Sequence, residues 1–190
     1  MIADDQYSII FVAHIDNREG MKRTRKLFSD INKNAKPVAK RDKIIIDEQE
    51  IAAIVTRRVY AEYEHFNNGA LIILSEETNL SSDDTTHYTN ITNLYDVVKI
   101  LQSLFKIPKG TNEWDEDNII NFKAIVFDFL NTIIGCKQEY KEFFISKTKS
   151  LSDLRQNNAY LLFRPVGFTM IAKYMLSLPK ETNLIFLRII

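Results

Sequence analysis

The sequence has few of the residues that mark extracellular, disordered or loop-rich proteins: one cysteine, five glycines and four prolines in 190 residues. The single cysteine, Cys136, excludes an internal disulfide framework and favours a reducing compartment. The scarcity of glycine and proline argues against a disordered chain. Hydrophobic residues make up 45% of the chain, which is enough for a core. We therefore expect a single folded domain over residues 1–190.

The chain also has no apolar run of the roughly 20 residues that a membrane-spanning helix needs. The longest candidate, residues 119–134, is interrupted by Asn121, Lys123, Asp128 and Asn131. The N-terminal sequence MIADDQYS lacks the basic start and apolar run of a signal peptide. These absences predict a soluble, cytoplasmic protein without a membrane partner.

Motifs for catalysis and cofactor binding are missing as well. There is no glycine-rich phosphate loop, no Cys/His cluster and no Gly-x-Ser-x-Gly elbow. The acids of a polar loop at residues 75–90 lie near His87, but their spacing fits no metal-ligand pattern. Cys136 has no histidine close to it in sequence, and a free cysteine is usually a small buried hydrophobe. We expect no catalytic residue, no metal and no cofactor, and do not expect this chain to be an enzyme.

Charge is balanced overall but unevenly distributed. The 25 basic and 25 acidic residues cancel, so only a local patch can support binding to nucleic acid. Between residues 18 and 43, ten Lys/Arg stand against three acids, Glu19, Asp30 and Asp42. Such an asymmetry can give a neutral protein an anion-binding face.

The basic segment contains a predicted amphipathic helix that Asp16 or Asn17 can cap and that ends before Pro37. Its apolar residues recur at spacings of three and four, at Met21, Leu27, Phe28 and Ile31. Two interpretations of the opposite, basic face stay open. It is either a solvated face that confers solubility or a surface that contacts phosphates. Asn32 and Asn34 can donate to phosphate or to a base edge, but asparagines also cap helix ends.

The remaining periodicity predicts an α+β fold that is predominantly α-helical, with about six helices and a few short strands. The core helices are expected around residues 51–59 and 119–134, and further helices at 94–106, 139–147 and 168–178. Strands are expected at residues 7–14 and 70–74. Residues 160–163 are expected to form a short strand or extended segment, and residues 43–46 a short linker or strand. The hydrophobic tail, TNLIFLRII at residues 182–190, is expected to dock on the core or on a partner.

The helix around residues 51–59 has a predicted N-terminal cap and two arginines whose roles stay open. Asp47 is expected to cap it, with Glu50 as a capping-box partner. Arg58 lies four residues before Glu62, so an intrahelical ion pair is one role for it. The other is that Arg57 or Arg58 turns toward the Asn32–Lys36 segment and helps to hold an anion.

The segment RTRKLFSDINKNAKPV, residues 23–38, resembles the conserved stretch of the DGQHR-domain family of DndB-like DNA sulfur-modification proteins. The family pattern is an arginine, then Phe-x-x-Ile-Asn, then Ala-Lys-x-Val. It is matched here by Arg25, Phe28, Ile31, Asn32, Ala35, Lys36 and Val38. Similar segments follow in the family's order at residues 47–59, 77–98 and 163–168.

The Asp-Gly-Gln-His-Arg motif that names the family is absent from this sequence. In relatives it lies upstream of a strand that precedes the Phe-x-x-Ile-Asn helix, and here only a few residues precede that strand. We therefore expect the chain to be the C-terminal portion of such a protein.

The resemblance implies a DNA-binding transcriptional regulator of a DNA phosphorothioation system, with DNA and other DNA-modification proteins as partners. One alternative is a fragment of a nucleotide-binding or nucleotide-hydrolysing protein with a ParB/sulfiredoxin-like fold. A second is a protein-interaction module or homo-oligomer. Under the first hypothesis the local charge excess forms one positive face for duplex DNA. The predicted contacts are Arg23, Arg25, Asn32, Lys33 and Lys36, with Arg57, Arg58 and Arg164 as second choices.

Overall fold

A computed structural model of the chain describes residues 17, 20, 23, 24, 27, 38–75, 77, 79–81, 83–108, 114–156 and 161–177. The chain divides into two compact units, Met1–Pro37 and Val38–Ile190, which we describe separately. The strand predicted at residues 7–14 and the tail at residues 182–190 lie outside the described residues. The single domain over residues 1–190 stays a prediction.

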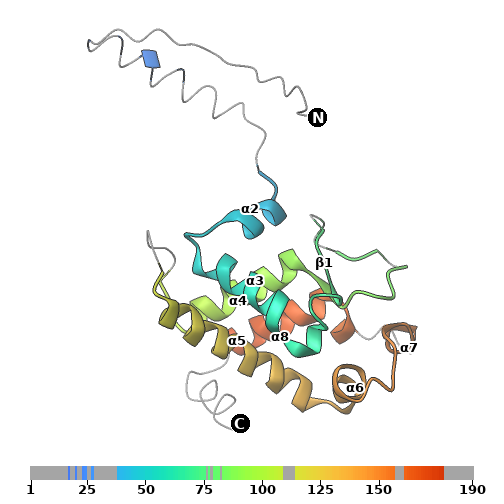
Figure 1. The fold of residues 1–190 in the computed structure, drawn as a ribbon. Helices are drawn as coiled ribbons and strands as arrows, with labels where there is room; N and C mark the ends of the chain where they lie inside the picture. Colours follow the sequence, from blue (N-terminus) through green and yellow to red (C-terminus); the bar gives the residue numbers. More distant parts are fainter. Residues whose placement is uncertain are drawn as a thin grey trace, which may run out of the picture. The chain divides into compact units, whose positions relative to one another are not determined.

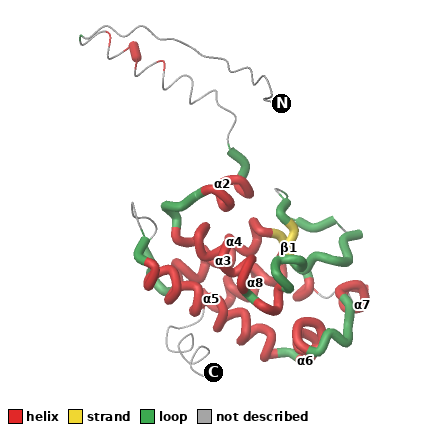
Figure 2. The backbone as a smooth tube through the Cα atoms, viewed as in Figure 1, coloured by secondary structure: helices red, strands yellow, loops and turns green. Residues whose placement is uncertain are grey.

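The second unit is predominantly helical, as predicted, and Figures 1 and 2 show how little strand it contains. Its described α-helices are α2 (Lys40–Ile46), α3 (Ile51–Glu62), α4 (Ile91–Leu104), α5 (Glu116–Cys136), α6 (Gln138–Tyr140), α7 (Leu151–Gln156) and α8 (Pro165–Ser177). The other described helices are the 3₁₀ helices η1 (Glu64–Phe66) and η3 (Leu161–Phe163) and the π-helix η2 (Lys141–Ile145). The strands β1 (Ile72–Ile73) and β2 (Thr89–Asn90) form one short parallel pair.

The core is built on α4, which packs against α3 and α8, while α5 packs against α3 (Figure 1). Apolar residues at helical spacing meet at these contacts because each helix buries one stripe. The fully buried members include Val55 and Val59 of α3, Leu94 and Val98 of α4, and Val126 of α5. The predicted core helices around residues 51–59 and 119–134 are therefore confirmed.

A cluster of aromatic rings connects the loop before α4 to η2, η3 and α8. The ring centroids of Tyr140 and Phe163 are 4.7 Å apart, and those of Tyr88 and Phe144 are 5.1 Å apart. Tyr88 also lies 5.7 Å from Phe168. Rings at these separations add to the hydrophobic contribution of burying them. The cluster thus fixes the C-terminal elements against the start of α4.

Residues 43–46 form part of a helix, α2, so the linker or strand predicted there is wrong. A strand would have placed Ile44 and Ile46 on the same face. Instead Ile44 is buried, whereas Ile45 and Ile46 are exposed. The run of β-branched residues suggested a strand, but tertiary contacts around Ile44 select the helix.

The predicted capping box at the start of α3 is also wrong. Asp47 accepts hydrogen bonds from the backbone N–H groups of Gln49 and Glu50, at 2.8 and 2.9 Å, in the turn that precedes the helix. The N-cap of α3 is Glu50, and its side chain makes no capping bond. Its carboxylate instead accepts hydrogen bonds from Tyr95 and Lys99 of α4, both at 2.5 Å. Glu50 therefore joins α3 to α4.

Residues 161–163, predicted as a strand or extended segment, form the short helix η3. Gly167 explains why η3 lies so close to α8. A Cβ atom at this position would lie 2.1 Å from the carbonyl oxygen of Leu161 and 2.7 Å from the Cα of Leu162. Only glycine allows this approach of the two backbones.

By length and composition alone, α5 could cross a membrane. In the structure, its buried residues face the core: Ile119, Phe122, Val126, Phe129, Leu130, Ile133 and Ile134. Lys123 of α5 pairs with Glu62 of α3. These contacts are those of a core helix in a folded unit.

Candidate nucleic-acid interface

The described residues of the first unit are consistent with the predicted basic helix. Gly20, Arg23, Thr24 and Leu27 are helical. The side chain of Asn17 accepts a hydrogen bond of 2.8 Å from the backbone N–H of Gly20. This is the geometry of an N-cap, which confirms Asn17 as one of the two residues predicted to cap the helix.

Of the predicted DNA contacts in this unit, only Arg23 is described. It is exposed, and its guanidinium makes no hydrogen bond or ion pair to another described residue. Leu27, predicted on the apolar face, is 36% exposed. The other predicted contacts lie outside the described residues: Arg25, Asn32, Lys33 and Lys36.

Arg57 is held by the end of α2. Its guanidinium donates to the carbonyl oxygens of Ile44 and Asp47, at 2.7 and 2.8 Å, and to the Glu48 carboxylate at 2.7 Å. The carbonyl of Ile44 belongs to the last turn of α2, where backbone acceptors have no partner within the helix. Arg57 therefore already satisfies backbone groups that would otherwise be left unpaired.

Arg58 is paired too, but not with Glu62 in its own helix. Both of its terminal nitrogens donate to the two carboxylate oxygens of Glu116, the first residue of α5, one of them at 2.8 Å. The hydrogen bond that Arg58 donates to Glu116 raises the pKa of Arg58 and lowers the pKa of Glu116. The pair joins α3 to the start of α5 in a bidentate geometry.

Arg164 lies between η3 and α8, and its carbonyl accepts from the N–H groups of Gly167 and Phe168 at the start of α8. Its guanidinium is half-buried and makes no hydrogen bond or ion pair to another described residue. The positive charge of Arg164 helps to lower the pKa of Arg155, although burial of Arg155 contributes more. No described residue therefore neutralises the side chain of Arg164.

Arg155 was not among the predicted site residues, and it holds the polar loop before α4 in place. It is 7% exposed. Its guanidinium donates to the carbonyl oxygens of Phe163 at 2.9 Å and His87 at 2.7 Å, and to that of Asp84. Nothing in the polar sequence around it distinguishes a buried arginine from a solvated one.

The loop itself is organised around Asp84. Its carboxylate accepts hydrogen bonds from the backbone N–H groups of Thr86 and His87 and lies 2.8 Å from Nδ1 of His87. Burial acts to raise the pKa of Asp84, but the hydrogen bonds from His87 and Thr86 outweigh it and lower the pKa to about 2. Within the described residues, no group of three His, Cys, Asp or Glu side chains could hold a metal ion.

Asn90 organises a buried polar network at the start of α4. Its Oδ1 atom accepts from the backbone N–H of Asn93 at 2.8 Å and from the hydroxyl of Thr92 at 2.8 Å. Its amide donates to the carbonyl of Glu77 at 2.8 Å. Asn93 in turn accepts from Thr169 of α8 at 3.2 Å. The network fixes the loop and α8 relative to α4.

Of the predicted contacts that the structure describes, Arg23 and Arg164 present guanidinium groups that can bind phosphate oxygens. Arg57 and Arg58 already have acceptors within the second unit. The chain resembles no curated protein and no solved structure closely enough to match. It does match the model of one protein family, described as DndB, DNA-sulfur modification-associated, over residues 1–186.

Proposed function

The chain belongs to the DndB family of DNA-sulfur modification-associated proteins, and we propose that it is the DNA-binding transcriptional regulator of such a modification system. A cytoplasmic location and contacts with other DNA-modification proteins are part of this proposal. The observation that carries it is the concentration of basic residues between residues 18 and 43, on a chain without net charge.

Two of these ten cations are neutralised within the second unit, since Lys40 pairs with Asp96 and Arg41 with Asp42, both at 2.7 Å. Seven of the ten lie at residues 18–36, where the only acids are Glu19 and Asp30. The excess therefore belongs to the segment before the second unit. Arg23, at an exposed helical position, is the basic residue of that segment that the structure describes.

Many cations elsewhere in the second unit are paired, which supports the assignment of DNA binding to the basic segment. Arg57 pairs with Glu48, Arg58 with Glu116, Lys99 with Glu50, Lys123 with Glu62 and Lys149 with Glu142. A phosphate would have to displace a carboxylate from each of these groups. We therefore give Arg23, Arg25, Asn32, Lys33, Lys36 and Arg164 the phosphate or base contacts, and Arg57 and Arg58 a supporting role.

A regulator must also distinguish one sequence from another, and arginine and asparagine are the side chains best suited to do so. Arginine binds guanine and asparagine binds adenine through paired hydrogen bonds in the major groove. Arg23, Arg25 and Asn32 supply both types within ten residues. Lysines nearby supply the phosphate contacts that position the protein on the duplex.

The experiment measures affinity for duplex DNA from upstream of the protein's own operon and for a scrambled duplex of the same length, at one salt concentration. We expect the upstream duplex to bind about a thousandfold more tightly, the lower end of the range for specific DNA-binding proteins. Equal affinities would overturn the regulatory role. No binding to either duplex would overturn the proposal as a whole.

A further inference from the structure

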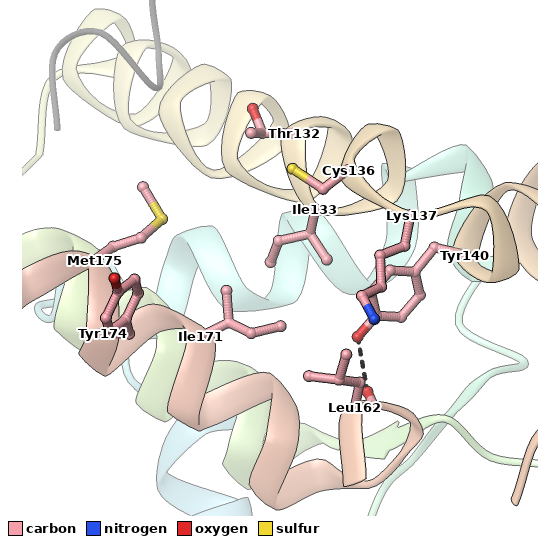
Figure 3. A pocket seen from close by; sticks show the side chains of 9 residues that line it. All are labelled: Thr132, Ile133, Cys136, Lys137, Tyr140, Leu162, Ile171, Tyr174 and Met175. Carbon is pink, nitrogen blue, oxygen red and sulfur yellow. Dashed lines mark hydrogen bonds between the residues drawn. The ribbon is translucent and has the colours of Figure 1, made fainter. Parts of the chain in front are cut away.

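A pocket of about 230 Å³ lies between α5 and α8. Figure 3 shows Thr132, Ile133 and Cys136 of α5 on one side, and Ile171, Tyr174 and Met175 of α8 on the other. Cys136 is exposed at this site, contrary to the buried position that we expected for it. The Tyr140 hydroxyl at the end of the pocket already donates to the carbonyl of Leu162 at 2.8 Å. The pocket therefore favours an apolar occupant.

The exposed face of α8 next to this pocket is apolar as well. Val166, Met170 and Tyr174 recur every four residues and are 45%, 51% and 65% exposed. This spacing places them in one row along the helix. Leu161 of η3, which precedes α8, is 48% exposed. Contiguous apolar surface of this kind marks a contact surface.

We propose that the C-terminal segment of this same chain, residues 184–190, covers the pocket and the row on α8. The sequence that follows Ser177 is LPKETNLIFLRII. Six of its last seven residues are apolar, and the seventh is Arg188. These residues lie outside the described part of the chain. A segment of this composition gains free energy by leaving water, and the pocket offers matching apolar surface.

The segment can reach the pocket. Leu184 lies seven residues after Ser177, and seven extended residues span up to about 24 Å. The pocket residue of α8 farthest from Ser177 is Ile171, six helical residues away, or about 9 Å along the axis. A chain that turns back after α8 therefore has more than the length it needs.

The covalent connection also favours this occupant over a second copy of the protein. A segment tethered by a short linker has an effective concentration in the millimolar range at its site. A second copy at micromolar concentration competes at a disadvantage of about a thousandfold. We therefore assign the pocket to the chain's own tail.

Cys136 makes this proposal testable, because it lines the pocket and is the only cysteine in the sequence. The first measurement is its rate of reaction with a thiol reagent in the full-length chain. The Leu184→Asp/Phe186→Asp variant should raise this rate about tenfold, because charged side chains release the tail. The matched control is Thr182→Asp/Asn183→Asp, which adds the same charge to polar positions of the tail and should leave the rate unchanged.

The second measurement keeps the proposal testable if the aspartate variant does not fold. Single cysteines introduced at Leu184, Phe186 and Ile189 are oxidised together with native Cys136. We expect an intramolecular disulfide in the monomer from at least one position, since a disulfide forms only when the Cβ atoms lie about 4 Å apart. Disulfides that only join two chains would overturn the proposal and assign the pocket to a second copy. Equal labelling rates in both aspartate variants would also overturn it.

Discussion

The arginines of the second unit differ in their hydrogen-bond partners. These partners decide which guanidinium groups are free to bind a phosphate. Arg155 is buried among carbonyl oxygens, whereas Arg57 and Arg58 are bound to acceptors on neighbouring helices. The guanidinium of Arg164 makes no hydrogen bond or ion pair to another described residue. The sequence predicts Arg57, Arg58 and Arg164 as candidate contacts but cannot rank them, because a partner such as Glu116 of Arg58 lies 58 residues away along the chain.

Replacing Arg155 with alanine should lower the free energy of unfolding by about 3 kcal/mol, because buried carbonyl groups lose a charged donor. The matched control is Arg41→Ala, which removes a partly exposed arginine paired with Asp42 and should cost less than about 1 kcal/mol. Urea titration of both variants measures the difference. A loss for Arg155→Ala no larger than that for Arg41→Ala would contradict the structural role of Arg155.

Asp84 should make the stability of the protein depend on pH in the acid range. Its folded-state pKa of about 2 lies below the value of about 3.9 in an unfolded chain. The ionised carboxylate therefore stabilises the fold above about pH 4, and this contribution is lost as the pH falls toward 2.

The Asp84→Asn variant isolates this contribution. Between pH 5 and pH 2.5 the unfolding free energy of the wild type should fall about 1 kcal/mol further than that of the variant, after allowance for solvent screening. Urea titrations at a series of pH values measure both curves. Parallel curves would show that the hydrogen bonds to Asp84 do not stabilise its ionised form.

At the scale of elements, periodicity predicted the long helices and failed on the short ones. The apolar spacing of α3, α4 and α5 survives in the structure because each of them packs its stripe against the core. The helices α2 and η3 are seven and three residues long, too short for a periodic signal. Their conformation depends on contacts with other elements. Arg57 of α3 donates a hydrogen bond to a carbonyl of α2, and Gly167 of α8 allows the close approach of η3.

The N-cap residues of α4 and α5 differ in whether their side chains make capping bonds. Asn90 accepts from Asn93 and Thr92 and donates to Glu77, whereas Asp115, at the N-cap of α5, makes no such bond. Asn90→Ala should therefore lower the unfolding free energy by about 2–3 kcal/mol. Asp115→Ala should cost less than about 0.5 kcal/mol. Thermal unfolding of both variants tests this, and equal costs would contradict the role of the buried network.

At the scale of the whole molecule, the unbalanced basic charge and the described core belong to different parts of the chain. Residues 38–177 contain the described core and many internal ion pairs, while residues 18–36 carry most of the unbalanced basic charge. The sequence could predict this separation because it requires only counting. It could not predict which cations of the second unit are free, because ion pairs such as Arg58 with Glu116 depend on how the helices pack.

The central claim, that the basic segment binds DNA, is tested most directly by how affinity for duplex DNA depends on salt. Each phosphate contact contributes about 0.9 to the slope of log affinity against log salt concentration. One variant replaces four predicted contacts with alanine: Arg23, Arg25, Lys33 and Lys36. The control variant replaces four exposed lysines of the second unit: Lys106, Lys141, Lys147 and Lys173.

Both variants lose four positive charges, so a difference between them reports position rather than net charge. We predict that the slope falls by about 3.6 in the first variant and keeps its wild-type value in the control. An unchanged slope in the first variant, or an equal fall in both, would contradict the claim.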